Sequence, residues 1–208
     1  GFGRPGWHLE CSVMAEELLG LPFDIHGGGA DLKFPHHENE IAQSCCAHGH
    51  LNELTAFSKY WVHNGFVTVE GDKMSKSIGN IRLVHDLIEH YSGEVLRLTL
   101  LSSHYRQPLN WSAKTIDQSQ KTLDRLYRTI RSLNISLDNT NAKPAQQVIN
   151  ALCDDLNTPE ALGQFNLIMK DLENAEGSQK EEKLAILIST ARMLGILQSD
   201  PDSWLGYQ

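Results

Sequence analysis

The spacing of apolar residues divides the chain into a mixed first third and a helical remainder. Before residue 80, short apolar runs alternate with glycine clusters, which is typical of α/β units. This pattern predicts a helix over 8–19, a short strand over 23–26, a helix from Pro35 to about Ala47, and extended chain over 60–69 that is interrupted at Asn64-Gly65.

Beyond residue 80 the pattern is helical. Apolar residues at 116, 123, 126, 130 and 133 recur at helical spacing and predict an amphipathic helix over 113–134. Four helices joined by short polar loops indicate a bundle. The other predicted helices cover 83–90, 92–101 with Ser92 as N-cap, a segment ending near Cys153, one starting at Asn157–Glu160, and a last one to Leu197 whose Ser178 and Glu181 have capping-box spacing.

Composition narrows the class of protein further. The chain has 208 residues, of which 40% are hydrophobic and 21% are charged, so we expect one large or two small globular domains. It contains no run of eighteen apolar residues, and we expect no membrane span. The net charge of −8 argues against indiscriminate nucleic-acid binding. A negative total charge is nevertheless compatible with local basic faces. Adjacent Cys45 and Cys46 in a helical pattern indicate reduced thiols and a cytoplasmic protein.

Cys11, His36 and Glu40 are three ligand types that zinc accepts. The H-x-x-x-E spacing puts His36 and Glu40 on one face of a helix. Three protein ligands leave a tetrahedral zinc with one open position, where a substrate can bind. The alternative is that the three are unrelated, with His36 and His37 capping a helix and Cys11 filling a core.

Two further segments suggest nucleotide chemistry. Gly27 and Gly28 follow a predicted strand and precede Asp31, an arrangement that lets the backbone approach a base while the acid holds ribose hydroxyls; a tight turn is the alternative. Lys73 and Lys76 lie three residues apart in a Ser/Gly-rich loop and can offset charge on a triphosphate; a solvated surface loop is the alternative.

The segment 73–77 reads Lys-Met-Ser-Lys-Ser, which matches the KMSKS signature of class I aminoacyl-tRNA synthetases. With that match, the chain as a whole resembles cysteinyl-tRNA synthetase. The resemblance rests on Arg4–Ser12, Asp24–Gly29, Phe34–Glu40, His63–Gly65 and Asp155–Pro159, which stand in the order and spacing of that family.

The resemblance implies ATP-dependent ligation of L-cysteine to tRNA(Cys) through a cysteinyl-adenylate, with Mg²⁺ accompanying ATP. It implies a zinc ion that binds the substrate thiolate and excludes serine, held by two cysteines, a histidine and a glutamate; Cys11, His36 and Glu40 match three of these. The remaining implied roles are substrate binding by Trp7 and His26, ATP binding by Gly27, Gly28, Asp31 and Lys76, and catalysis by Lys73 and Lys76. The alternative for Trp7 is a core aromatic residue, and His26 is equally the partner of a buried backbone group.

The helix over 113–134 is the candidate RNA-binding element. Lys121, Arg125 and Arg128 lie near one stripe of this helix, which can follow a phosphate backbone. An ordinary solvated face is the alternative. A helical domain that contacts tRNA is what the resemblance implies.

The expected fold class is α/β: the C-terminal half of a class I Rossmann-like catalytic domain, followed by a helical bundle. The expected domains are residues 1–53 for the catalytic half, 54–112 for a connecting region with the KMSKS loop, and 113–208 for the bundle. The family's HIGH motif, first zinc cysteine and anticodon-reading domain are not recognised in the sequence. We therefore expect a monomeric piece that makes no adenylate by itself and holds zinc weakly.

Two other functions fit parts of the pattern. A related ligase joins cysteine to an amino-sugar pseudodisaccharide in mycothiol synthesis, using the same fold and zinc. A non-catalytic RNA- or zinc-binding module is the second. A tRNA gel shift separates the first from a synthetase, and a HIGH motif upstream excludes the second.

Overall fold

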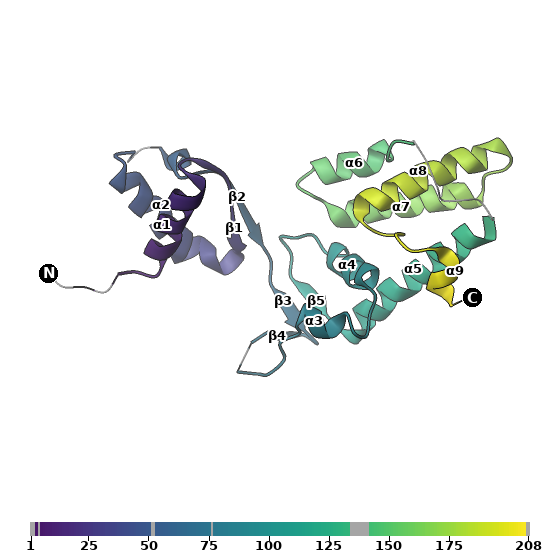
Figure 1. Cartoon of the computed structure of the whole chain (residues 1–208), viewed down its shortest axis with the longest axis horizontal. Coiled ribbons are helices and arrows are strands. Elements are labelled where there is room, and N and C mark those ends of the chain that lie inside the picture. Colours follow the sequence, from purple (N-terminus) through teal and green to yellow (C-terminus); the bar gives the residue numbers. More distant parts are fainter. Residues whose placement is uncertain (1–2, 4, 51–52, 76, 134–141, 207–208) are drawn as a thin grey trace. The chain divides into compact units, whose positions relative to one another are not determined.

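The computed structural model describes residue 3 and residues 5–50, 53–75, 77–133 and 142–206. The chain forms two compact units, Gly1–Phe66 and Val67–Gln208, which are treated separately below (Figure 1). Lys76 lies outside the described residues, as does most of the loop predicted before Pro144.

The first unit is a small α/β layer built on two parallel strands. β1 (Phe23–Gly29) pairs with β2 (Ser58–Asn64) in a register that runs from Phe23↔Ser58 to Gly29↔Asn64. The predicted strand therefore extends through all three glycines. Its helical elements are α1 (His8–Leu19), η1 (Ala30–Leu32), η2 (Lys33–His37), α2 (Glu38–Ala47) and η3 (Leu54–Ala56).

The start of α2 differs from the prediction. Pro35 lies in a π-helical turn, η2, and the α-helix begins three residues later at Glu38. Phe34 is extended, with φ −137° and ψ 133°, which is the conformation that a residue before proline favours. The periodicity of the sequence does not reveal this turn, and it places His36 and His37 directly before α2.

The second unit begins with a three-stranded sheet of order β4-β3-β5. β3 (Val67–Val69) pairs antiparallel with β4 (Asp72–Lys73) and parallel with β5 (Leu109–Trp111). The extended segment predicted over 60–69 therefore contributes to two different sheets. The helix predicted over 83–90 is shorter, α3 (Val84–Leu87), whereas α4 (Gly93–Leu101) starts where predicted, because the Ser92 hydroxyl accepts a hydrogen bond from Val95 N.

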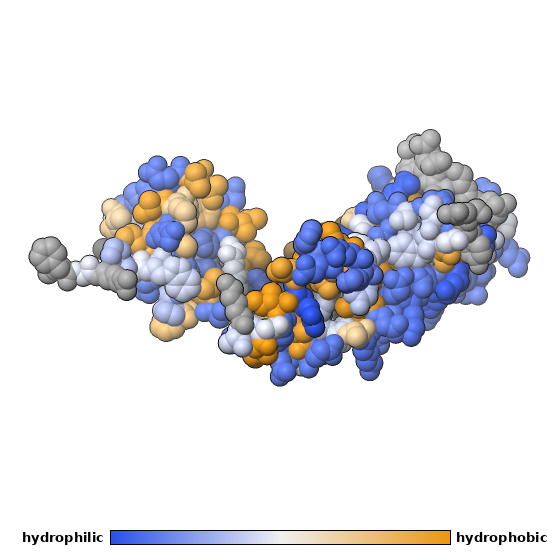
Figure 2. Space-filling view, turned by 60° about the horizontal axis from the view of Figure 1, so that its bottom comes forward, coloured by the Kyte–Doolittle hydropathy of each residue, from blue (hydrophilic) through white to orange (hydrophobic). Residues whose placement is uncertain are grey.

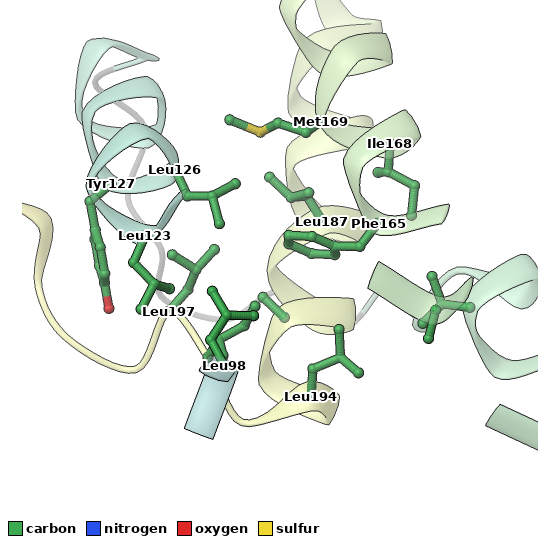
Figure 3. Close-up of a cluster of buried hydrophobic side chains, with 14 of the residues drawn as sticks. Leu98, Leu123, Leu126, Tyr127, Phe165, Ile168, Met169, Leu187, Leu194 and Leu197 are labelled. Carbon is green, nitrogen blue, oxygen red and sulfur yellow. The ribbon is translucent and has the colours of Figure 1, made fainter. Parts of the chain in front are cut away.

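The helices of the second unit surround one apolar core. They are α5 (Ala113–Leu133), α6 (Gln146–Cys153), α7 (Thr158–Glu173), α8 (Ser178–Leu194) and α9 (Pro201–Leu205). The predicted stripe of α5 is buried except for the half-buried Leu133. Figure 3 shows this core, formed by side chains that include Leu98, Leu123, Leu126, Tyr127, Phe165, Ile168, Met169, Leu187, Leu194 and Leu197.

Two helix-end predictions have different outcomes. Asn157 caps α7, with its side-chain oxygen accepting from Glu160 N, as expected. The capping box at Ser178 is wrong: Ser178 is the first residue inside α8, and Gly177 precedes it at φ 58° without a side-chain cap. Glycine at a left-handed φ makes this turn without the extended N-cap that a serine supplies. α8 also ends earlier than predicted, at Leu194, because the following Gly195 adopts the left-handed C-cap conformation.

Polar contacts fix α4 and the small sheet to the bundle. The carboxylate of Glu94 accepts hydrogen bonds from Tyr127 Oη at 2.8 Å and from Leu197 N at 2.8 Å. Glu70, in the turn after β3, accepts from Ala113 N at 3.0 Å and so caps the start of α5. The sheet and the helices of this unit are therefore joined at several points far apart in the sequence.

Candidate metal and nucleotide sites

Three elements of the first unit bring the predicted zinc ligands together. Cys11 comes from α1, His36 from η2 and Glu40 from the first turn of α2. One donor atom from each lies within 4.8 Å of the other two, and His36 Nε2 approaches Glu40 Oε1 to 2.6 Å. Cys11 is half-buried, whereas the other two are buried.

The buried polar atoms of this cluster fit a cation. His36 Nδ1 is buried without a hydrogen-bond partner among the described residues, and the buried carboxylate of Glu40 faces only the imidazole nitrogens of His36 and His26, at 2.6 and 3.1 Å, and the Cys11 thiol. Such groups are costly unless an ion or another partner compensates them. Burial raises the pKa of Glu40 to about 7 and lowers the pKa of His36. Burial, then the charge of Glu40, raises the pKa of the Cys11 thiol. Thiolate, imidazole and carboxylate form a donor set that suits zinc.

A histidine cluster lies beside this set and was only partly foreseen. His26 Nε2 is 3.1 Å from Glu40 Oε2, and His26, His37 and Glu40 form a second group with metal-ligand spacing. His37 Nδ1 is 2.8 Å from His63 Nε2, and burial lowers the pKa of His37 to about 4. The sequence predicts substrate binding for His26, only an alternative helix-capping role for His37, and no individual role for His63. The proximity of His37 and His63 depends on the parallel pairing of β1 and β2, which sets Gly28 opposite His63. No local sequence pattern predicts this pairing.

Trp7 lies next to the ligand set and not in a core. Its ring centroid is 4.3 Å from that of His36, with the planes at 36°, and 65% of the residue is exposed. The alternative of a core aromatic residue is therefore wrong. An exposed indole beside a candidate metal ligand leaves one face available to a bound molecule.

Gly28, after the predicted strand, is needed for packing. Gly27 and Gly28 are strand residues, not turn residues. A Cβ on Gly28 would lie 2.8 Å from His37 Cε1, so that only glycine admits this ring at its observed position. Asp31 is exposed in η1. Its Oδ1 would lie only 2.5 Å from a Cβ placed on Gly29. The structure thus brings Asp31 to the end of the glycine strand.

The KMSKS segment lies in the second unit, at the end of β4. Asn80 holds its described part: its Oδ1 accepts from Ser75 N at 2.8 Å, and its Nδ2 donates to Lys73 O at 3.2 Å. The Lys73 side chain is exposed. The role of Asn80 in holding this segment is not predicted from the sequence, although an amide that bridges backbone groups is frequent in turns.

The basic residues of α5 are exposed but partly neutralised. Lys121 Nζ is 2.6 Å from Asp117 Oδ2, and Arg128 Nη2 is 3.8 Å from Asp124 Oδ2. Arg125 donates instead to the Asn166 side-chain oxygen of α7, at 3.5 Å. Exposed ion pairs of this kind are weak, so the side chains can exchange their carboxylates for phosphates.

Comparison with solved structures defines the class of fold. The chain resembles the leucyl-tRNA synthetase of Agrobacterium radiobacter K84 in its complex with tRNA, with a TM-score of 0.62 and 19% identity over 90% of this chain and 28% of that one. It also resembles Mycobacterium tuberculosis methionyl-tRNA synthetase in complex with methionyl-adenylate, with a TM-score of 0.55 and 19% identity over 88% of this chain and 44% of that one. Both are synthetases, and the likeness shows the fold of a class I aminoacyl-tRNA synthetase.

Sequence comparison gives the family. Residues 1–121 match the profile of the tRNA synthetases class I (C) catalytic domain, and residues 147–198 match the DALR domain. The chain belongs to this class I (C) tRNA synthetase family. It is 50% identical to the cysteine–tRNA ligase of Parvibaculum lavamentivorans over 206 residues, and 50% identical to that of Maricaulis maris over 214 residues.

These matches cover nearly all of the chain but only part of the relatives. They include 98% and 99% of this chain, and 43% and 44% of the two ligases. The fold class expected from the sequence, a class I catalytic portion followed by a helical domain, is confirmed. Within the described ranges, no helix combines the length and apolar content needed to cross a membrane.

Proposed function

We propose that the complete protein containing this chain is a cysteine–tRNA ligase, which activates L-cysteine with ATP and Mg²⁺ and transfers it to tRNA(Cys). The observation that carries this proposal is the Cys11–His36–Glu40 cluster, in which a fully buried carboxylate lies 2.6 Å from His36 Nε2 and one donor atom of each residue lies within 4.8 Å of the other two. The 50% identity to cysteine–tRNA ligases supports the same activity.

Cys11, His36 and Glu40 are the residues that would hold zinc. Bound there, zinc would supply a soft Lewis acid that prefers a thiolate to a hydroxyl, and so distinguishes cysteine from serine. Glu40 and Cys11 would hold the ion in their deprotonated forms, against the upward pKa shifts that burial causes in the ion-free site.

Trp7 and His26 flank the ligand set and would form the amino-acid pocket. The indole of Trp7 lies against His36, where it excludes water from one side of a small bound side chain. His26 is kept neutral, since burial and then the neighbouring His36 and His63 lower its pKa. A neutral imidazole can orient the amino acid by hydrogen bonding without adding a charge to the pocket.

Gly27, Gly28 and Asp31 would hold adenosine, and Lys73 and Lys76 the phosphates. The glycine strand exposes backbone that a flat base can approach, and Asp31 at its end can accept from ribose hydroxyls. The lysines would offset the charge that develops on leaving pyrophosphate. In this step the cysteine carboxylate attacks the α-phosphate of ATP, and pyrophosphate leaves.

Lys121, Arg125 and Arg128 would contact the phosphates of tRNA. All three are exposed on α5, and their partners within the chain are exposed or partly exposed side chains. We further propose that the protein is a cytoplasmic monomer, and that its domains divide at 1–53, 54–112 and 113–208.

The test is charging of a total tRNA preparation with labelled cysteine by the complete protein. We expect ATP-dependent incorporation of the label into tRNA. Excess unlabelled cysteine should reduce this incorporation by competition, and serine should not. Label that requires an amino-sugar acceptor and ignores tRNA would favour the mycothiol-type ligase. The absence of both products would contradict the proposal.

A further inference from the structure

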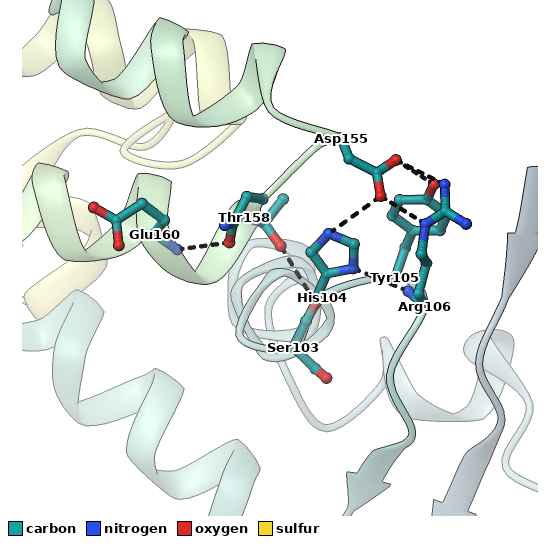
Figure 4. A network of polar contacts seen from close by, with 8 residues as sticks. Ser103, His104, Tyr105, Arg106, Asp155, Thr158 and Glu160 are labelled. Carbon is teal, nitrogen blue, oxygen red and sulfur yellow. Dashed lines mark hydrogen bonds and ion pairs between the residues drawn. The ribbon is translucent and has the colours of Figure 1, made fainter.

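A polar contact in the second unit joins the loop after α4 to the corner between α6 and α7 (Figure 4). Asp155 Oδ1 accepts from Tyr105 Oη at 2.6 Å and from Arg106 Nη2 at 3.0 Å, and Oδ2 accepts from Arg106 Nε at 2.6 Å. We call these three residues, Tyr105, Arg106 and Asp155, the Asp155 latch. A planar guanidinium that donates two hydrogen bonds to one carboxylate gives a directional contact, in contrast to a simple ion pair.

The latch holds a backbone corner that is unfavourable by itself. Asp155 and Leu156 both adopt left-handed conformations, with φ 52° and 53°, and neither is glycine. The Leu156 side chain is 58% exposed, so its burial does not stabilise the corner. Non-glycine residues keep such conformations only where surrounding contacts determine them. Two kinds of contact hold this corner. The hydrogen bonds from Arg106 and then Tyr105 keep the pKa of Asp155 at about 2, and backbone hydrogen bonds such as Leu156 N to Leu152 O, at 3.1 Å, hold the neighbouring chain.

A second contact beside the latch strengthens the same junction. Thr158, the first residue of α7, donates through its hydroxyl to Ser103 O at 3.3 Å. Asn157 caps α7 between the two contacts. The start of α7 is therefore fixed directly to the loop over 102–108.

This loop leads to the strand pair that carries the KMSKS segment. It continues into β5, β5 pairs with β3, and β3 pairs with β4 through Thr68↔Lys73. On the other side of the latch, α7 carries Asn166, which accepts from Arg125 of α5. The latch thus connects the sheet from which the KMSKS segment emerges with helices of the candidate RNA-binding face. Tyr105 and Arg106 lie within the catalytic-domain match, and Asp155 lies within the DALR match.

We propose that the Asp155 latch is a positioning device, which fixes the DALR helices relative to the KMSKS-bearing sheet so that bound tRNA receives the aminoacyl group. This inference rests on the proposed function. Asp155 contacts no reacting group in this account: it acts through Arg106 and Tyr105. Adenylate formation needs the amino acid, ATP and the KMSKS segment, and therefore does not depend on the orientation of the helices. Transfer to tRNA does depend on it.

The experiment compares both steps in the complete protein. Cysteine-dependent ATP–pyrophosphate exchange reports adenylate formation, and tRNA charging reports the overall reaction. For Asp155→Asn we expect exchange within about twofold of wild type, and charging lower by at least about tenfold in kcat/KM for tRNA, because small misplacements of a bound substrate are costly. Arg106→Lys keeps the charge but loses the two-bond geometry, so it should behave similarly.

Two further variants control for general destabilisation. Asp154→Asn removes the same charge one residue away and should leave both steps unchanged. Tyr105→Phe removes one hydrogen bond and should give an intermediate loss of charging, even if Asp155→Asn does not fold. Melting temperatures of all variants show how much stability each loses.

Equal losses of exchange and charging in the latch variants would contradict the proposal, because they would indicate a merely structural role. Unchanged charging in these variants would contradict it as well. A wild-type protein without cysteine-dependent exchange would instead contradict the proposed function, and the latch inference would fall with it.

Discussion

At the scale of single residues, Glu40 has the most informative environment. It is fully buried, its two oxygens face His36 and His26, and burial raises its pKa to about 7. A carboxylate in such a place is stabilised by a cation and destabilised without one. The H-x-x-x-E spacing correctly predicted that His36 lies next to Glu40. His26 also lies next to Glu40, but it comes from a strand that no local sequence pattern relates to α2.

Substitution of a zinc ligand should weaken metal binding, whereas substitution of a cysteine outside the site should leave zinc affinity unchanged. For Glu40→Gln and Cys11→Ser we expect zinc affinity to fall by at least about tenfold, since each removes an anionic ligand. Competition with a chromophoric chelator measures the affinity. Cys46→Ser is the control, because Cys46 is exposed and lies outside both metal-ligand groups. Equal zinc affinity in all four proteins would exclude this metal site.

The Asp155 latch should make stability depend on pH in the acid range. The folded pKa of Asp155, about 2, lies below the usual value near 3.9, so its ionised form stabilises the fold. This contribution is complete above about pH 4 and is lost as the pH falls toward 2. The difference in melting temperature between wild type and Asp155→Asn should therefore shrink as the pH falls below about 4. His104 Nε2, 3.9 Å from Asp155 Oδ2, is the other titratable group beside this carboxylate. A pH-independent difference, or the same curve for Asp154→Asn, would contradict this role.

At the scale of elements, long helices were predictable and short strands were not. The apolar repeat of α5 and the cap at Asn157 are local signals, and both are confirmed. β4 and β5 have only two and three residues. β4 pairs with β3 across a local turn, as in Val69↔Asp72, whereas β5 pairs with β3 over a long stretch of sequence, as in Val69↔Trp111. The π-turn before α2 is similarly invisible to periodicity.

The α7 helix offers a direct test of the core. Phe165 is buried at 2% exposure against α5 and α8 residues of the same cluster, whereas Leu167 on the same helix is 50% exposed. Phe165→Ala should lower the free energy of unfolding by about 3–5 kcal/mol, through lost burial and a cavity. Leu167→Ala should change it by less than about 0.5 kcal/mol. Urea denaturation measures both, and similar losses would show that the helix packs differently.

The basic face of α5 should be detectable through salt dependence. Charge reversal of Arg125 and Arg128 should weaken tRNA binding and reduce the slope of log affinity against log salt, because fewer counterions are released. Lys143→Glu, an exposed change outside α5, is the control. Filter binding across a salt series gives the slope. An unchanged slope in the double variant would exclude this face as the phosphate contact.

At the scale of the whole molecule, the family match and the two compact units divide the chain differently. The catalytic-domain match runs to residue 121, past the boundary between the units after Phe66. The second unit therefore contains both the KMSKS segment and the DALR helices, joined by Glu70, Glu94 and the Asp155 latch. The sequence motifs identified the class of protein, but these joints involve residues far apart in the chain and required the structure.

The central claim is that the Cys11–His36–Glu40 cluster makes the complete protein selective for cysteine. The most direct measurement is ATP–pyrophosphate exchange with cysteine and with serine, in wild type and in Glu40→Gln. We expect exchange with cysteine alone in the wild type, at least about a hundredfold above serine, and loss of the cysteine reaction in the variant. Equal exchange with the two amino acids, or full cysteine activity in Glu40→Gln, would contradict the account.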